Sequence, residues 1–375
     1  MNRKKLVLLL LTVIVLATAV LGLQAVQADD LQPAPDAFPK AEGVSNDYCL
    51  SCHATADQRY TLPSGEEILL TVNQDEYNHS VHGIGGYACV QCHTNIVSYP
   101  HPEMTAKTRR DLTLDLNGTC ASCHAWAYDE TQVGAHQLAQ ANGNKDAAVC
   151  TDCHPAHNVQ PLDEPRTLIP ETCERCHSQI YDVYAHSVHG EALIGEGNED
   201  VPDCVDCHGS HFIHGPSTDN FRLYSPEICA KCHADKDLMK KYGISTDVFE
   251  TYVTDFHGKS VMLFEPQYPG QETNKPVCID CHGVHDIRSK DDPKSSVMQD
   301  NLQKTCKKCH PDANSSFPAA WMGHYPPSPD NFPLVYYVNL FYKIFIPAVL
   351  GFMVFFITAD FIRRLVNRRR EGSHA

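Results

Sequence analysis

Long apolar runs occur only near the two ends of the chain. Close to the start, Arg3, Lys4 and Lys5 precede an uncharged, largely aliphatic stretch at residues 6–23, and small residues lead up to Ala28. This order of basic, apolar and small residues is typical of a secretory signal peptide, which we place at residues 1–28. Because the apolar run is long for a signal, an uncleaved N-terminal anchor is the alternative. Either interpretation exports the residues that follow.

The second apolar run lies near the C-terminus. Residues 344–359 are uncharged, and the aromatic and aliphatic residues before Lys343 extend the run past the roughly 20 residues that cross a bilayer. We expect a transmembrane helix at 339–365, kinked at Pro347, with Lys343 and Asp360 near its ends, where charged side chains reach the interface. Five arginines at its end are Arg363, Arg364, Arg368, Arg369 and Arg370. They place a basic tail, 366–375, in the cytoplasm and the preceding domain on the periplasmic side of the cytoplasmic membrane, in a single-pass topology.

Cysteine and histidine dominate the chemistry between these two runs. The 375 residues include Cys 18 and His 22, and so many thiols favour disulfides or metal and cofactor attachment in an exported protein. The formal net charge is -16. Nucleic acid is therefore not expected as a partner, since binding to phosphates needs Lys and Arg.

Every cysteine belongs to a CxxCH motif. The nine motifs, numbered in chain order, are Cys49, Cys52, His53; Cys89, Cys92, His93; Cys120, Cys123, His124; Cys150, Cys153, His154; Cys173, Cys176, His177; Cys204, Cys207, His208; Cys229, Cys232, His233; Cys278, Cys281, His282; and Cys306, Cys309, His310. Structural zinc usually needs two CxxC units per ion and gives no reason for an adjacent histidine. Disulfides within CxxC would close only tiny loops. The spacing predicts c-type haem attachment, with two thioethers and one histidine ligand to iron.

With these motifs the chain resembles the multihaem cytochrome c superfamily over residues 49–310. The resemblance implies nine covalently bound c-type haems, attached outside the cytoplasmic membrane. It also implies a mainly α fold, with short helices and extensive loops wrapped around a chain of haems. We therefore expect a linker at 29–48, a nine-haem domain at 49–324 and a Pro-rich linker at 325–338 before the transmembrane helix.

Histidines outside the motifs show an internal repeat that nominates the second, distal iron ligands. Motif 1 comes first and stands outside the repeat. Four units follow it, and each unit consists of a lone histidine and then two motifs. Unit 1 contains motifs 2 and 3, unit 2 contains motifs 4 and 5, unit 3 contains motifs 6 and 7, and unit 4 contains motifs 8 and 9. The first motif of units 2 to 4 reads CxDCHxxH, which adds a paired histidine. The lone positions are His82, His136, His189 and His257, and the paired positions are His101, His157, His211 and His285.

Two of the nine distal assignments rest on weaker patterns. His101 is only the nearest substitute for the paired histidine, which unit 1 lacks. For the ninth ligand we favour His324, just before the membrane, over His79, His186 and His214. Methionine, the other candidate axial ligand, recurs at no matched position, so we expect mostly bis-histidine, low-potential haems. The sequence leaves open which distal histidine serves which iron.

The density of motifs predicts an electron carrier without catalytic residues. About 31 residues per haem is too little chain for separate protein cores, so porphyrins would fill the interior and lie close together. Such a chain would relay electrons between a membrane partner, a quinone-reactive or cytochrome b subunit, and an extracytoplasmic acceptor, with basic redox partners steered by its acidic charge. The alternative is a multihaem reductase of a small nitrogen or sulfur oxyanion with one five-coordinate haem.

Overall fold

The structure is a computed structural model that describes residues 44–96, 98–215, 221–264, 275–318, 324–330 and 332–371. The predicted signal peptide, most of the predicted 29–48 linker and the end of the basic tail lie outside the described residues. The described chain is mainly helical, which confirms the predicted mainly α class. One short antiparallel hairpin, β1 (Arg59–Thr61) with β2 (Glu67–Leu69), pairs Tyr60 with Ile68.

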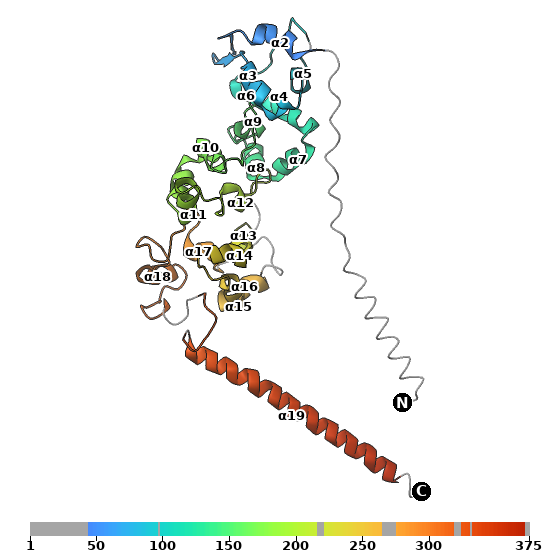
Figure 1. Ribbon diagram of the computed structural model, residues 1–375, viewed down its shortest axis with the longest axis vertical. Helices are drawn as coiled ribbons and strands as arrows, with labels where there is room; N and C mark the ends of the chain where they lie inside the picture. Colours follow the sequence, from blue (N-terminus) through green and yellow to red (C-terminus); the bar gives the residue numbers. More distant parts are fainter. Residues whose placement is uncertain are drawn as a thin grey trace.

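Most helices are only one to three turns long. The first half contains α2 (Asn46–His53), α3 (Gln74–His79), α4 (Val81–Ile84), α5 (Cys89–Cys92), α6 (Arg109–Asn117), η1 (Gly118–Ser122), α7 (Ala125–Val133), α8 (Ala135–Ala141), α9 (Cys150–Cys153) and α10 (Leu168–Ala185). The second half contains α11 (Val188–Gly190), η2 (Glu191–Gly195), α12 (Cys204–His208), α13 (Phe221–His233), α14 (Lys236–Lys241), α15 (Val248–Thr254), α16 (Phe256–Phe264), α17 (Cys278–His282), α18 (Gln299–Cys306) and α19 (Pro333–Glu371). Figure 1 shows them succeeding one another along one long axis, from α2 at one end to α15, α16 and α18 near the start of α19.

Several motif histidines lie at the end of a helix or directly after it. The helices α12 and α17 end at His208 and His282, and α9 ends one residue before His154. Inside α10, His177 has φ −108° and ψ 41°, so the helix is interrupted at the motif. The two cysteines of a motif thus share one helical turn, and the histidine projects from its end.

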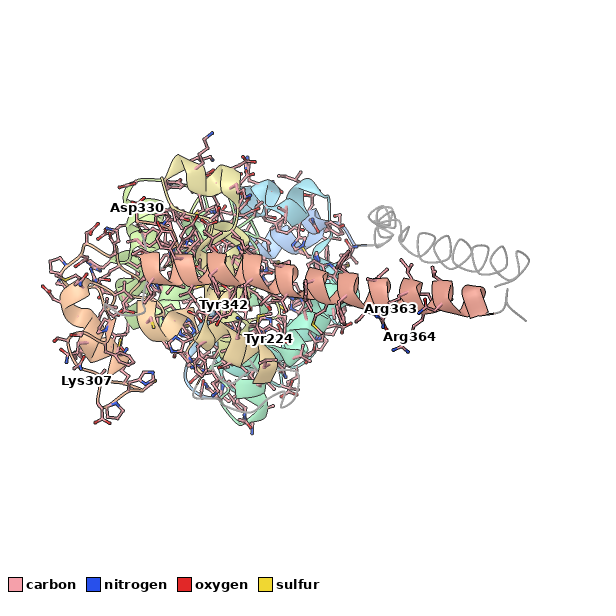
Figure 2. All side chains as sticks on the ribbon, turned by 90° about the horizontal axis from the view of Figure 1, so that it is seen from below. Tyr224, Lys307, Asp330, Tyr342, Arg363 and Arg364 are labelled. Atoms are coloured by element: carbon pink, nitrogen blue, oxygen red, sulfur yellow. The ribbon has the colours of Figure 1, made fainter. Side chains whose placement is uncertain are left out.

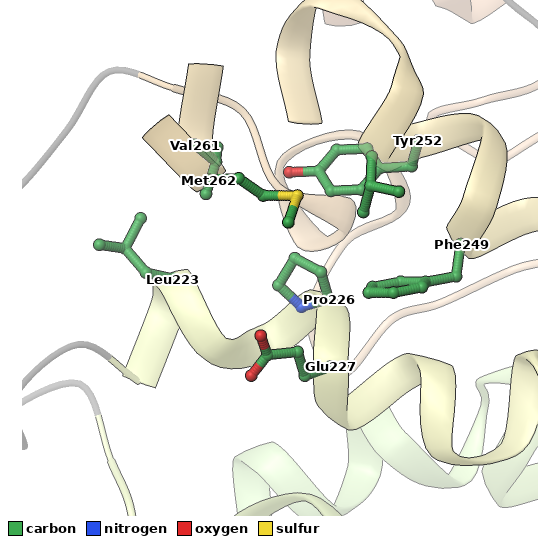
Figure 3. A pocket seen from close by; sticks show the side chains of 8 residues that line it. Leu223, Pro226, Glu227, Phe249, Tyr252, Val261 and Met262 are labelled. Carbon is green, nitrogen blue, oxygen red and sulfur yellow. The ribbon is translucent and has the colours of Figure 1, made fainter. Parts of the chain in front are cut away.

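The apolar core is small for a chain of this length. Twelve hydrophobic residues in the described part are buried. One buried cluster forms among them, made of Leu223, Val261 and Val277 with Ile279 packed against it. Figure 3 shows its surroundings, where Phe249 and Tyr252 line a cavity of about 30 Å³, which is room for water and not for an organic substrate. Aliphatic packing alone therefore holds little of this fold together.

The helix α19 extends away from the other helices (Figures 1 and 2). Residues Pro333–Asn367 are long and apolar enough to cross a membrane, with a mean hydropathy of 2.2 and 0% of the window buried. Its start at Pro333 precedes the predicted 339, because proline suits the first turn of a helix. The helix continues through Pro347, and Asp360 pairs with Arg364 at 2.7 Å. The candidate anchor is thus longer than predicted, while its sidedness stays a prediction.

A recurring break between two helices presents the lone histidines. In unit 3, Ser187 is 1% exposed and its Oγ accepts a hydrogen bond from the Gly190 backbone N–H at 3.1 Å. Ser80 does the same for Gly83 in unit 1, and the Asp255 carboxylate does it for Gly258 in unit 4. Each pattern is Tyr-x-x-Ser/Asp-x-His-Gly, so the cap fixes the first turn that carries the histidine.

The glycine of this pattern is required by space. A Cβ on Gly190 would overlap the carbonyl oxygen of Tyr184, whereas a Cβ on Gly195 would meet nothing within 4 Å. We predict that Gly190→Ala lowers the free energy of unfolding of the full-length protein by about 2 kcal/mol or more, because backbone must move. Gly195→Ala is the matched control and should change it by less than about 0.5 kcal/mol. Thermal unfolding measures both, and equal melting temperatures for the two variants would contradict this interpretation.

Candidate functional site

Histidine rings face each other in pairs throughout the described residues. Each pair joins the histidine of one CxxCH motif to one histidine outside the motifs. Eight pairs have ring centroids 5.9 to 6.4 Å apart: His53–His101, His82–His124, His93–His157, His136–His177, His189–His233, His208–His285, His257–His310 and His282–His324. The remaining motif histidine, His154, has His211 nearby. Burial, and after it the charge of His211, lower the pKa of His154. The structure thus brings all nine nominated distal histidines to a motif.

The pairing follows the repeat with one rule for each kind of position. A lone histidine faces the second motif of its own unit, as His82 faces His124. A paired histidine faces the first motif of the preceding unit: His157 faces His93, His211 lies near His154, and His285 faces His208. Neighbouring units therefore interlock, because each completes a site in the one before it.

The same rule accounts for His101 and His324, the two candidate distal histidines with the weakest sequence patterns. His101 belongs to unit 1 and faces His53 of the leading motif, with the two rings inclined by only 4°. Unit 4 has no successor in the repeat, and His324 takes the vacant role opposite His282. Sequence spacing alone could not assign these partners, because the sites form only when two units pack.

The facing imidazoles are in the chemical form that binds a metal. The Nδ1 of His53 lies 2.8 Å from the Leu70 carbonyl oxygen, and the Nδ1 of His208 lies 2.7 Å from that of His214. A carbonyl can only accept, so Nδ1 carries a proton, and in the neutral ring Nε2 then keeps its lone pair. Burial lowers the pKa of His189 and of His282 to about 4, which keeps these rings neutral. Two such imidazoles can hold one metal ion between them.

The remaining candidate histidines have other contacts. His79 and His186 direct Nδ1 to the carbonyl oxygens of Asp75 and Asp182, each at 2.7 Å on the same helical turn. His214 stacks on Phe221, with ring centroids 5.9 Å apart, and its backbone carbonyl orients His208. None of the three faces a motif histidine in the manner of the pairs within the described residues, so His214 supports a site rather than completing one.

Successive motifs lie next to each other along the whole chain. Four junctions bring first cysteines into contact: Cys49–Cys89, Cys120–Cys150, Cys173–Cys204 and Cys229–Cys278. At the four alternate junctions a second cysteine faces both cysteines of the next motif: Cys92, Cys153, Cys207 and Cys281. Burial and Cys49 raise the pKa of the Cys89 thiol to about 11. The two kinds of junction alternate with the two-motif period of the sequence repeat.

Arginine–aspartate ion pairs join the two motifs at three of the four junctions where the first cysteines of successive motifs meet. Arg166 pairs with Asp203 at 2.7 Å and with Asp206, and Arg222 pairs with Asp280 at 2.5 Å. Arg110 pairs with Asp152 at 2.8 Å in the same manner. Asp152, Asp206 and Asp280 are the third residue of CxDCH, and each also accepts a hydrogen bond from the backbone N–H of the residue before its motif, which in motif 6 is Asp203. Sequence analysis missed these arginines, although Arg166 and Arg222 each lie seven residues before a first cysteine.

Backbone contacts lock the paired histidine of one unit to the lone histidine of another. The residue before three of the four lone histidines donates its N–H to the carbonyl two residues after a paired histidine: Val81 to Val159, Ala135 to Ile213, and Val188 to Ile287, at 2.9 to 3.0 Å. The tyrosine five residues before a lone histidine donates to the carbonyl two residues before a motif: Tyr77 to Tyr87, Tyr184 to Pro202, and Tyr252 to Pro276. These bonds fix the lone and paired histidines of neighbouring units at once.

Open space lies beside the motifs rather than in an aliphatic core. A cavity of about 250 Å³ borders Cys176, His177 and the three residues that follow. Cys176 and His177 of motif 5 therefore border room for a bulky group.

No known protein family, curated protein or solved structure matches this chain.

The tyrosine contact gives a test of how the sites are positioned. We predict that Tyr184→Phe lowers the free energy of unfolding by about 1 kcal/mol, because it removes the 2.7 Å hydrogen bond to the Pro202 carbonyl while keeping the ring. Tyr181→Phe on the same helix is the control and should cost less than about 0.5 kcal/mol. Chemical denaturation of the full-length protein measures both. Equal losses would show that the Tyr184 hydroxyl does not stabilise the unit.

Proposed function

We propose that this chain is a membrane-anchored c-type cytochrome with nine haems that relays electrons between a membrane partner and an extracytoplasmic redox partner. The proposal rests above all on the nine CxxCH motifs and on the pairing of each motif histidine with one distal histidine. Covalent attachment to paired thiols and two axial imidazoles per iron account for both features together.

The separation of the histidine rings fits an iron between them. A metal–imidazole bond is about 2 Å, and the ring centroid lies about 1.2 Å beyond the nitrogen, so two opposed ligands put their centroids roughly 6.4 Å apart. The eight pairs of rings have centroid separations of 5.9 to 6.4 Å. Direct stacking of two aromatic rings needs no such constant spacing, since it is found from about 4.5 to 7 Å.

Each residue of a site has a distinct role in this proposal. The two cysteines hold the haem in place, the motif histidine binds one face of the iron, and the distal histidine binds the other. Haem bound in this way carries one electron as the iron changes between Fe(III) and Fe(II). With a histidine held on each side, such an iron would have no free position for a substrate, which favours electron transfer over substrate binding.

The order of the motifs suggests the direction in which the relay extends. Motif 1, in α2, lies at the end of the molecule far from α19 (Figure 1). His324, which faces motif 8, precedes the first residue of α19 by only nine positions. We therefore place the membrane partner at motifs 8 and 9, and the extracytoplasmic partner toward motif 1. The quinone-reactive or cytochrome b nature of the membrane partner stays a prediction.

The reductase alternative receives less support from the same geometry. A reductase of a nitrogen or sulfur oxyanion needs an iron with an open position. Every motif histidine has a nominated partner nearby, including His53 with His101 and His282 with His324. A site for substrate would require one of these partners to leave.

The decisive experiment counts haems and assays turnover on the same full-length protein. After expression with c-type haem maturation, intact mass spectrometry should show nine haem additions, because all 18 thiols are available for thioethers. A reduced dye should reduce the protein, while nitrite and hydroxylamine should not be consumed catalytically. Fewer than nine additions would contradict the stoichiometry, and sustained nitrite turnover would favour the reductase.

A further inference from the structure

One distal histidine, His211, has a buried ring nitrogen without a hydrogen-bond partner in the described part of the chain. The Nδ1 of His211 is the one buried side-chain nitrogen or oxygen without a hydrogen-bond partner among the residues that the structure describes. By contrast, Nδ1 of the motif histidines His53 and His208 each meets a backbone carbonyl. Burying an N–H without a hydrogen-bond acceptor costs free energy, so an acceptor beside Nδ1 of His211 would stabilise this site.

A carboxylate lies just beyond hydrogen-bond distance of this nitrogen. Glu130 Oε2 is 3.8 Å from His211 Nδ1. The Glu130 side chain is 49% exposed and free to turn, whereas that of His211 is 30% exposed. A change of side-chain torsion in Glu130 can therefore close the gap without moving the backbone.

The backbone around this contact is held firmly. Trp126, one turn before Glu130 on α7, meets the His211 ring edge to face, with ring centroids 5.2 Å apart. Ala135 N–H donates to the Ile213 carbonyl at 2.9 Å, which fixes the start of α8 against the segment that carries His211. The position of Glu130 is thus built into the packing of unit 2 on unit 3.

The repeat supplies an internal comparison. The contact of Ala135 with Ile213 recurs as that of Val188 with Ile287 at 2.9 Å, so His285 occupies in unit 4 the place of His211 in unit 3. Glu130 lies six residues before a lone histidine, and the residue at that position before His189 is Val183. The site of motif 6, which His285 completes, therefore has an aliphatic side chain where the site of motif 4 has a carboxylate.

We propose that Glu130 accepts a hydrogen bond from Nδ1 of His211 and thereby lowers the reduction potential of the haem at motif 4. This inference rests on the proposed function, in which His154 and His211 are the two axial ligands of that haem. A carboxylate on the outer nitrogen makes a ligating imidazole a stronger donor, which stabilises Fe(III) relative to Fe(II). Glu130 is a positioning and tuning residue, since it acts through His211 and does not bind iron.

A potentiometric titration of the full-length, haem-loaded protein, followed by haem absorbance, tests the proposal. Glu130→Gln should move one ninth of the absorbance change to a more positive potential. Asp129→Asn removes the same charge from the neighbouring position and should leave the curve unchanged. Val183→Glu should do the reverse at the site of motif 6 and move one ninth of the change to a more negative potential.

Each outcome decides the matter. An unchanged curve for Glu130→Gln would overturn the proposal, as would equal shifts for Glu130→Gln and Asp129→Asn, which would indicate only a general effect of charge. The double variant Glu130→Gln with His211→Met should shift no further than His211→Met alone. Intact mass separates this test from the proposed function, because nine haems with an unchanged curve would refute the role of Glu130 alone.

Discussion

The separation between two facing imidazoles is the constraint on which the rest of the structure depends. Centroid distances of 5.9 to 6.4 Å recur in pairs that come from quite different local structures, such as the helix-end His282 and the loop residue His324. Twelve buried hydrophobic residues could not impose that regularity on the described part of the chain. In the proposed account, a planar group between each pair sets the distance, and helices and loops are arranged to hold its two ligands.

The repeat turns this local constraint into a long molecule. Each paired histidine completes a site in the preceding unit, as His157 does for His93, so no unit is complete by itself. Arg166 and Arg222 then bind aspartates of the following motif across the junctions. Contacts of this kind join only neighbours, as in other repeat proteins, and leave the chain extended from α2 to α19 (Figure 1). Such an arrangement suits transfer along a line.

The residues that form the candidate sites could be predicted from the sequence, but which histidines pair with each other could not. The resemblance carried by the CxxCH motifs implied the mainly α class, hydropathy predicted the C-terminal apolar helix, and recurrence nominated the distal histidines that the structure brings to motifs. Pairing was not predictable, because His211 approaches His154 only when two units pack. The Arg166 ion pair and the Tyr184 contact were also missed, although both recur at fixed spacings from a cysteine or a histidine.

The claim that two histidines bind each iron is tested most directly by low-temperature electron paramagnetic resonance of the fully oxidised, full-length protein. Two imidazoles on every iron give a low-spin ferric centre at each motif. The account therefore predicts low-spin signals alone, accounting for all of the iron. A high-spin ferric signal equal to one haem or more would show an iron with an open position and would contradict it.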